Sequence, residues 1–131
     1  MDCVLDTCTF FWLADDQSKL SAPSLKLIEN RSSVLHVPVI VLVELHRLIR
    51  RGRIVIRAPD GLDKWFRSAL AQYQAFCEPI TLEIAHAAEV LPPIHNDPAD
   101  RFILATAQIL HATILSPDTM MRSYSGANVV W

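Results

Sequence analysis

The feature that most constrains the fold is the alternation of short apolar runs with longer segments of helical periodicity. Strands are predicted at residues 3–5, 34–37, 78–82, 113–115 and 128–130. Helices are predicted at residues 7–14, 23–30, 39–51, 63–76, 83–91 and 98–111, with a short helix near Thr119. Strands separated by helices pair in parallel, with helices on both faces of the sheet. We therefore expect an α/β fold: a three-layer sandwich around a central, mostly parallel sheet of four to five strands.

Length and composition fit one soluble domain. The 131 residues, 51% of them hydrophobic, suit a single domain over 1–131. The net charge of −2 excludes a strongly basic nucleic-acid binder, so any nucleic-acid contact needs a local basic patch. The longest apolar run, residues 37–43, contains Pro38, so no membrane span is expected. Three cysteines without a CxxC pair, and no signal peptide, indicate a reduced, cytoplasmic setting.

Two aspartates come shortly after predicted strands. Asp6 comes after residues 3–5, and Asp118 comes three residues after 113–115. Open parallel sheets carry their sites beyond the carboxyl ends of the strands, so both residues are candidates for a functional site. Each also has a purely structural explanation, because Asp6 could cap the helix that begins at Thr7, and Asp118 could be a turn or cap residue.

Glu44 lies in the middle of the predicted helix at 39–51. Its helical neighbours are Ile40, Val41 and Leu48 on one side, and only Arg47 is polar. A carboxylate on an apolar stripe needs a partner, because burying an isolated charge costs several kcal/mol. The alternative is a pair with Arg47 on a solvated face.

The stretch HNDPADRFIL, residues 95–104, places two aspartates around a proline. Asp97 precedes Pro98, and proline favours the first helical position, so Asp97 is a natural N-cap. Asp100 then lies in the first turn and shares a side of the helix with Ile103 and Leu104. The helix dipole favours an acid there by about 0.3–1 kcal/mol, which is a weak reason for one that faces inward.

These four acids would repel one another if they converged, unless a cation lay among them. Hard oxygen ligands favour Mg²⁺ or Mn²⁺ over zinc. The five histidines show no HExxH motif or paired spacing, so we expect the cluster to contain oxygen ligands without His or Cys.

Five segments in order resemble a known family, the PIN-domain ribonucleases, and within it the VapC-type toxins of bacterial and archaeal toxin–antitoxin pairs. The segment LPPIHNDPADRFILATAQ is the most specific, because DPxDR followed by an apolar Ala-Thr-Ala helix is typical of the family. The five segments are LDTCTFFWL (5–13), VELHRLIRRGRI (43–54), LPPIHNDPADRFILATAQ (91–108), ATILSPD (112–118) and VVW (129–131). The resemblance implies a PIN-like sandwich over the whole chain.

The resemblance also implies a function: a Mg²⁺-dependent endoribonuclease, with Mn²⁺ as a possible substitute. The implied catalytic residues are Asp6, Glu44, Asp100 and Asp118. Asp6 and Asp100 would be the main metal ligands, and Asp118 would be a further ligand directly or through water. Glu44 would hold a second ion or orient the water. The implied partners are RNA, a cognate antitoxin protein and a second copy of the chain in a homodimer.

Two hydroxyls and one basic segment could support this site. Thr7 and Ser116 could orient carboxylates, and ordinary capping or turn bonding is the alternative. The basic segment could contact RNA phosphates, although cations at a helix C-terminus are commonly solvated. Its arginines are Arg47, Arg50, Arg51, Arg53 and Arg57. The aromatic residues Trp12, Trp65 and Phe66 are expected in the core or an interface rather than as RNA-stacking platforms.

Two other functions remain open from the sequence. The chain could be a catalytically inactive PIN-like module that binds RNA or a protein partner. It could also be a phosphoaspartate-type phosphatase or receiver, which likewise has an aspartate after its first strand. Cys8 stands where such a phosphatase has a second aspartate, which disfavours that interpretation.

Overall fold

The computed structural model describes residues 1–131 and contains one parallel sheet. Its strand order is β3-β2-β1-β4-β5, so the chain starts in the centre of the sheet and extends it in both directions. The strands are β1 (Asp2–Leu5), β2 (Val34–Pro38), β3 (Phe76–Glu78), β4 (Thr113–Leu115) and β5 (Val129–Val130). All four pairings are parallel, which confirms the predicted sheet type.

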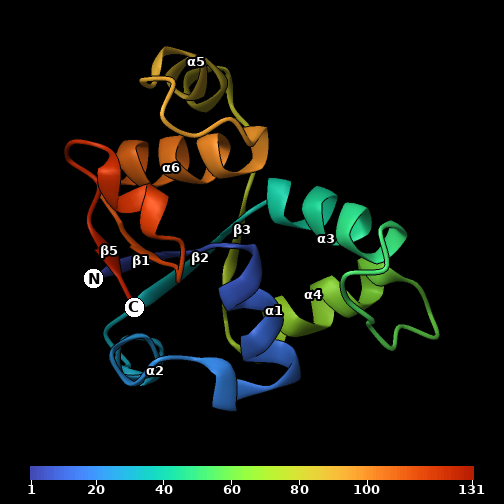
Figure 1. Ribbon diagram of the computed structural model, residues 1–131. Helices are drawn as coiled ribbons and strands as arrows, with labels where there is room; N and C mark the ends of the chain where they lie inside the picture. The colour runs from blue at the N-terminus through green and yellow to red at the C-terminus, as the bar shows by residue number, and fades with distance from the viewer.

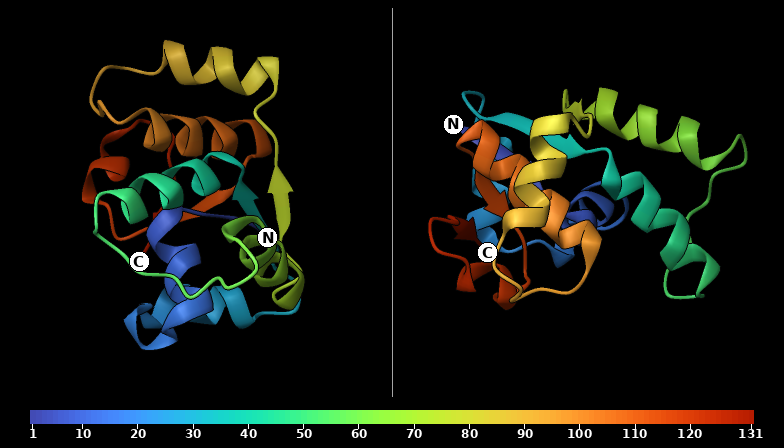
Figure 2. Two further views of the ribbon diagram at one scale, coloured as in Figure 1. Left: turned by 90° about the vertical axis from the view of Figure 1, so that its right-hand side faces the viewer. Right: turned by 90° about the horizontal axis from the view of Figure 1, so that it is seen from above.

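Helices cover both faces of this sheet and give three layers (Figures 1 and 2). On one face α6 lies against the sheet, and α5 packs on the outer side of α6. On the other face lie α1, α2 and α4, while α3 reaches from α6 towards α1 and α4. The helices are α1 (Thr7–Asp15), α2 (Ala22–Glu29), α3 (Ile40–Arg50), α4 (Leu62–Gln72), α5 (Leu82–Val90) and α6 (Pro98–Leu110), with short 3-10 helices η1 (Gln17–Lys19) and η2 (Thr119–Ser123). The predicted α/β sandwich is confirmed.

Short polar side chains fix where the helices begin. Asp97 caps α6 by accepting a hydrogen bond from the Ala99 backbone N–H at 3.0 Å, as its position before Pro98 predicts. Thr81 caps α5 in the same way, through the N–H of Ile84. At the other end of α6, His111 adopts a left-handed conformation that stops the helix before β4. These caps hold α6 at a defined position relative to the sheet.

The main core lies between the sheet and the helices around it. Phe10 of α1 is fully buried and packs edge-on against Trp65 and at 5.0 Å from Phe66, both in α4. Trp12 packs against Trp131 at the end of the chain. Trp12, Trp65 and Phe66 therefore belong to the core, as expected. None of the helices is both long enough and apolar enough to cross a membrane.

Two neighbouring predictions are wrong, the end of α4 and the position of β3. The helix expected at 63–76 ends at Gln72, and the strand expected at 78–82 lies at Phe76–Glu78. Gln74 adopts a positive φ of 52°, and the Ala75 N–H bonds back to the carbonyl of Leu70, so the chain reverses earlier than the apolar pattern indicates. Pro79 has no N–H to donate, which explains why β3 stops at Glu78.

Candidate functional site

The pairing of β1 with β4 creates the candidate site. Leu5 and Leu115 are partners in register, so the next residues, Asp6 and Ser116, leave the sheet side by side. The Asp6 N–H bonds to the carbonyl of Leu115 at 3.3 Å, and the Thr9 hydroxyl donates to the same carbonyl at 2.7 Å. Two segments 110 residues apart in sequence therefore meet at the carboxyl edge of the sheet.

Asp6 is buried, with 5% of its surface exposed, and it is held on both carboxylate oxygens. One oxygen accepts the Thr9 backbone N–H at 2.9 Å, which is the expected helix cap. The other accepts the Ser116 hydroxyl at 2.5 Å, while the Ser116 oxygen itself accepts the backbone N–H of Asp118 at 3.0 Å. Ser116 thus connects Asp6 to the turn that carries Asp118. Capping and facing the site are compatible roles for Asp6.

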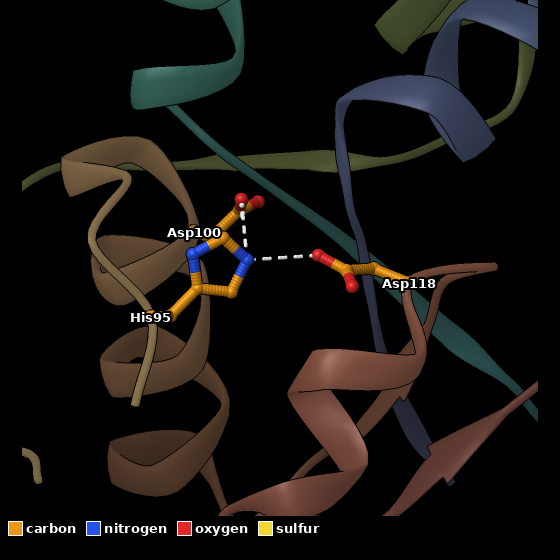
Figure 3. Close-up of side chains that lie close together, drawn as sticks. All are labelled: His95, Asp100 and Asp118. Atoms are coloured by element: carbon orange, nitrogen blue, oxygen red, sulfur yellow. Dashed lines mark hydrogen bonds and ion pairs between the residues drawn. The ribbon is translucent and has the colours of Figure 1, made fainter. Parts of the chain in front are cut away.

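The structure brings Asp100, Asp118 and His95 together in one group (Figure 3). Each offers a ligand atom, and the three atoms lie within 4.8 Å of one another. His95 Nε2 is 2.9 Å from Oδ2 of Asp118 and 3.0 Å from Oδ2 of Asp100. Asp100 comes from the first turn of α6 and Asp118 from the cap of η2, so the two acids converge from different elements. Asp6 and Glu44 are not members of this group.

His95 corrects the expectation of an acidic cluster without histidine. It lies in the loop between α5 and α6, and 11% of its side chain is exposed. No spacing rule identifies it, because the contact depends on how residues 91–97 fold back over the start of α6. The only sequence signal is its position five residues before Asp100, inside the segment that resembles the PIN family most closely.

Glu44 is half-buried and makes no ion pair, so the expected alternative of a pair with Arg47 does not form. Desolvation raises its pKa, and the charges of Asp97 and Asp6 raise it further. The buried Thr7 hydroxyl has no hydrogen-bond partner of standard geometry, yet it lies close enough to Glu44 to offset part of that rise, as does Arg47. The Thr7 hydroxyl therefore lies where it stabilises the charged form of Glu44 rather than that of Asp6.

The carboxylates of the site are held in an environment that disfavours their charge. Desolvation raises the pKa of Asp100 to about 7, the charges of Asp97, Glu44 and Asp118 add to the rise, and His95 opposes it. Desolvation also raises the pKa of Asp6, against the hydrogen bonds from Ser116 and Thr9. Burial and neighbouring carboxylates therefore both oppose ionisation of these acids.

The thiol of Cys8 responds to the same field. Desolvation, followed by the charges of Asp6, Glu44, Asp100 and Asp118, raises the pKa of Cys8 to about 12. A thiol that stays protonated at neutral pH is a poor nucleophile and a poor metal ligand. Cys8 thus reports the negative potential of the site without being a candidate for its chemistry.

The donor set fits a hard divalent cation. Carboxylate oxygens that converge from separate elements, with raised pKa values, are stabilised by a positive charge placed among them. Asp100 and Asp118 each offer an oxygen, and these oxygens lie within 4.8 Å of each other. Asp6 is linked to Asp118 through hydrogen bonds of Ser116. Oxygen donors of this kind suit Mg²⁺ or Mn²⁺.

A basic rim borders the site. Arg47, Arg51 and Arg53 line a cavity of about 470 Å³ together with Glu44 and Asp97. None of these arginines makes an ion pair within the chain, so their charges are available to a ligand. Arg50 and Arg57 are exposed and do not line this cavity.

The fold and the site define an α/β protein with an acidic cluster at the carboxyl edge of a parallel sheet. The family model of the PIN domain matches residues 3–127, so the chain belongs to the PIN-domain family. No curated protein sequence matches it.

Two solved structures share this fold. One is VapBC2 from Rickettsia felis bound to a DNA fragment from their promoter, with a TM-score of 0.68 and 15% identity over 100% of this chain and 99% of that chain. The other is a toxin–antitoxin complex from Klebsiella pneumoniae, with a TM-score of 0.64 and 17% identity over 98% of this chain and 96% of that one. Identities this low establish the shared fold alone.

Proposed function

We propose that this PIN-domain protein is a divalent-metal-dependent endoribonuclease and the toxin of a VapC-type toxin–antitoxin pair. The observation that carries the proposal is the convergence of Asp100 and Asp118 at the carboxyl edge of the sheet, with Asp6 linked to Asp118 through Ser116. The pKa values of Asp6 and Asp100 are raised, and the carboxylates of Asp100 and Asp118 lie close together. This edge therefore disfavours an anionic substrate unless a cation binds. The likeness to toxin–antitoxin complexes in fold supports the same assignment.

Asp100 and Asp118 would hold the cation, with Asp6 as a further ligand directly or through water. Bound Mg²⁺ or Mn²⁺ supplies an activated water and stabilises charge on the phosphate oxygens. Ser116 fixes the orientation of the Asp6 carboxylate through their 2.5 Å hydrogen bond. Glu44, whose carboxylate makes no ion pair in the chain, would accept a proton from water or approach a second ion.

The proposed substrate is RNA held along the basic rim. Arg47, Arg51 and Arg53 lie beside Glu44 and would pair with phosphates on either side of the cleaved bond. Water rather than the ribose 2′-hydroxyl would attack, so we expect products with a 5′-phosphate and a 3′-hydroxyl. No aromatic side chain lines this cavity, which favours backbone contacts over base stacking.

A small antitoxin protein would restrain this activity. The fold is shared with proteins solved in toxin–antitoxin complexes, and a second copy of the chain would complete a homodimer. Co-expression with the neighbouring reading frame should relieve growth inhibition and yield a stable complex on purification. Toxicity that no neighbouring protein relieves would favour a stand-alone nuclease.

Cleavage of a single-stranded RNA by the purified protein tests the nuclease directly. We expect cleavage with Mg²⁺ or Mn²⁺, loss of cleavage with EDTA, and recovery when the metal is restored in excess. Mapping of the product ends checks for a 5′-phosphate. A folded wild-type protein that binds RNA and does not cut it with either metal would establish the inactive binding module instead.

A further inference from the structure

His95 is fixed in the site through its backbone as well as its ring. The His95 N–H donates to the buried hydroxyl of Tyr124 at 2.7 Å, and its carbonyl accepts from Arg101 Nη1 at 3.2 Å. These two contacts come from opposite sides of the loop, one from the segment after η2 and one from α6. A loop residue held at both backbone groups has a defined position relative to the acids.

Arg101 fastens the rest of the same loop. Its guanidinium donates to the carbonyls of Ala88 at 2.8 Å, Leu91 at 2.7 Å and Pro92 at 3.0 Å, in addition to His95. A planar guanidinium loses little entropy for each hydrogen bond that it makes, so one side chain can organise a whole turn. Arg101 follows Asp100 directly, which couples the position of this loop to the acid it covers.

The hydrogen bonds of the ring determine which nitrogen carries the proton. Nδ1 of His95 accepts the backbone N–H of Asp97 at 3.3 Å, so Nδ1 is an acceptor. In the neutral ring the hydrogen then lies on Nε2, which faces Asp118 and Asp100. A histidine that binds a metal through Nε2 usually donates its other N–H to an acceptor, and here the other nitrogen faces a donor. The surroundings of the ring therefore favour donation over metal ligation.

We propose that His95 is a positioning residue, which holds the carboxylates of Asp100 and Asp118 together by presenting one N–H to both. This inference rests on the proposed metal site. The two acids come from different elements and repel each other, and the shared N–H offsets that repulsion while their oxygens lie within 4.8 Å of one another. Each carboxylate has about four lone-pair positions, so the contact with His95 leaves others for a metal.

Mn²⁺ binding, measured by EPR on the full-length protein, tests this role. His95→Leu removes the donor, His95→Gln keeps an N–H near the position of Nε2, and His86→Leu is the matched control on the exposed side of α5. We expect His95→Leu to weaken Mn²⁺ binding by about 10- to 100-fold, which is the usual effect of losing a hydrogen bond to a metal ligand. His95→Gln should recover most of the affinity, and His86→Leu should bind as wild type does. The melting temperature of each variant checks that it is folded.

Four outcomes would overturn the assignment. Unchanged or tighter binding by His95→Leu would show that the ring does not assist the carboxylates. Equal losses in His95→Leu and His95→Gln would show that shape rather than the N–H matters. A nitrogen coupling typical of a directly bound imidazole in the wild-type Mn²⁺ spectrum would make His95 a ligand. Failure of the wild type to bind Mn²⁺, or equal binding by wild type and Asp100→Asn, would overturn the metal site and this inference together.

Discussion

Two histidines of this protein each lie between two carboxylates, and the surroundings of the two differ. His36 in β2 uses both ring nitrogens, with Nδ1 2.6 Å from Glu78 and Nε2 2.7 Å from Asp2. Its two acids therefore lie on opposite sides of the ring. His95 faces both of its acids with one nitrogen, so their oxygens lie close to a common point. The placement of the two carboxylates around each histidine, rather than the residue types, decides whether both could bind one cation.

The number of nearby charges separates the two regions further. His36 joins three neighbouring strands, and its ring satisfies one acid on each side. Around His95, desolvation raises the pKa of Asp100 to about 7, and the charges of Asp97, Glu44 and Asp118 add to the rise. We infer that His36 stabilises the sheet, whereas the buried carboxylate of Asp100 beside His95 opposes folding when it is ionised.

The largest expected difference between the regions is in cleavage. Asp100→Asn and Asp6→Asn should each reduce RNA cleavage by at least about 100-fold, because each removes a charged ligand of the proposed metal site. Asp2→Asn, which removes an acid beside His36, should cleave at the wild-type rate. Initial rates with Mg²⁺, on variants whose circular dichroism matches wild type, measure this. A comparable loss in Asp2→Asn would erase the distinction.

The second difference is in stability at the His36 region. His36→Leu leaves Glu78 and Asp2 without their partner, and 9% of the His36 side chain is exposed against 49% for Asp2. Because Asp2 is half-solvated, we expect a loss of about 1–3 kcal/mol in the free energy of unfolding rather than the larger cost of a fully buried pair. Urea denaturation measures it, and unchanged stability would show that the ring is not a structural tie.

The third difference has the opposite sign. Desolvation raises the pKa of Asp100 to about 7 from its ordinary 3.8, so its ionisation opposes folding. The free energy of unfolding therefore has its full value, as far as Asp100 is concerned, below pH 3.8. It falls as the pH rises towards about 7 and stays reduced above that pH. Asp100→Asn removes this dependence. In metal-free buffer at pH 8 it should raise the free energy of unfolding by on the order of 1–3 kcal/mol, and the melting temperature should rise with it. The gain should vanish near pH 4, and a gain that is constant with pH would contradict the raised pKa.

The smallest effect concerns the basic rim. Arg51→Gln and Arg53→Gln should each weaken RNA binding uniformly across sequences and reduce the slope of log K against log salt by about 0.7. Arg67→Gln, in α4 and outside the cavity, is the control. Binding of a single-stranded RNA at several salt concentrations, with each variant made in an Asp100→Asn background that should not cleave, measures this. If Arg51→Gln and Arg53→Gln had the same slope as Arg67→Gln, the rim would not contact RNA phosphates.

Much of the fold was predictable because local signals agree with the overall structure. The apolar run at β1, Pro98 after Asp97, and the strand before Asp118 each point to the element that forms. The boundary between α4 and β3 was not predictable, because it depends on the left-handed conformation of Gln74, which no residue type there demands. Tertiary contacts rather than periodicity set that end.

The site was predictable in part. Asp6 and Ser116 meet because strands pair in register, and the position of an acid after a strand indicates this. The placement of His95 and the five backbone contacts of Arg101 depend on how a loop without periodicity folds over α6. Such contacts leave no spacing pattern in the sequence. The convergence of Asp100 with Asp118 likewise becomes visible only once α6 and η2 are placed.

An anomalous-scattering map from crystals containing Mn²⁺ tests the central claim most directly. We predict a manganese peak within bonding distance of Asp100 and Asp118 oxygens, and none between Asp2 and Glu78, whose oxygens lie on opposite sides of His36. The Mn²⁺ concentration should be high enough to saturate a site with a millimolar dissociation constant. A map without a peak at the carboxyl edge of β1 and β4 under these conditions would contradict the account.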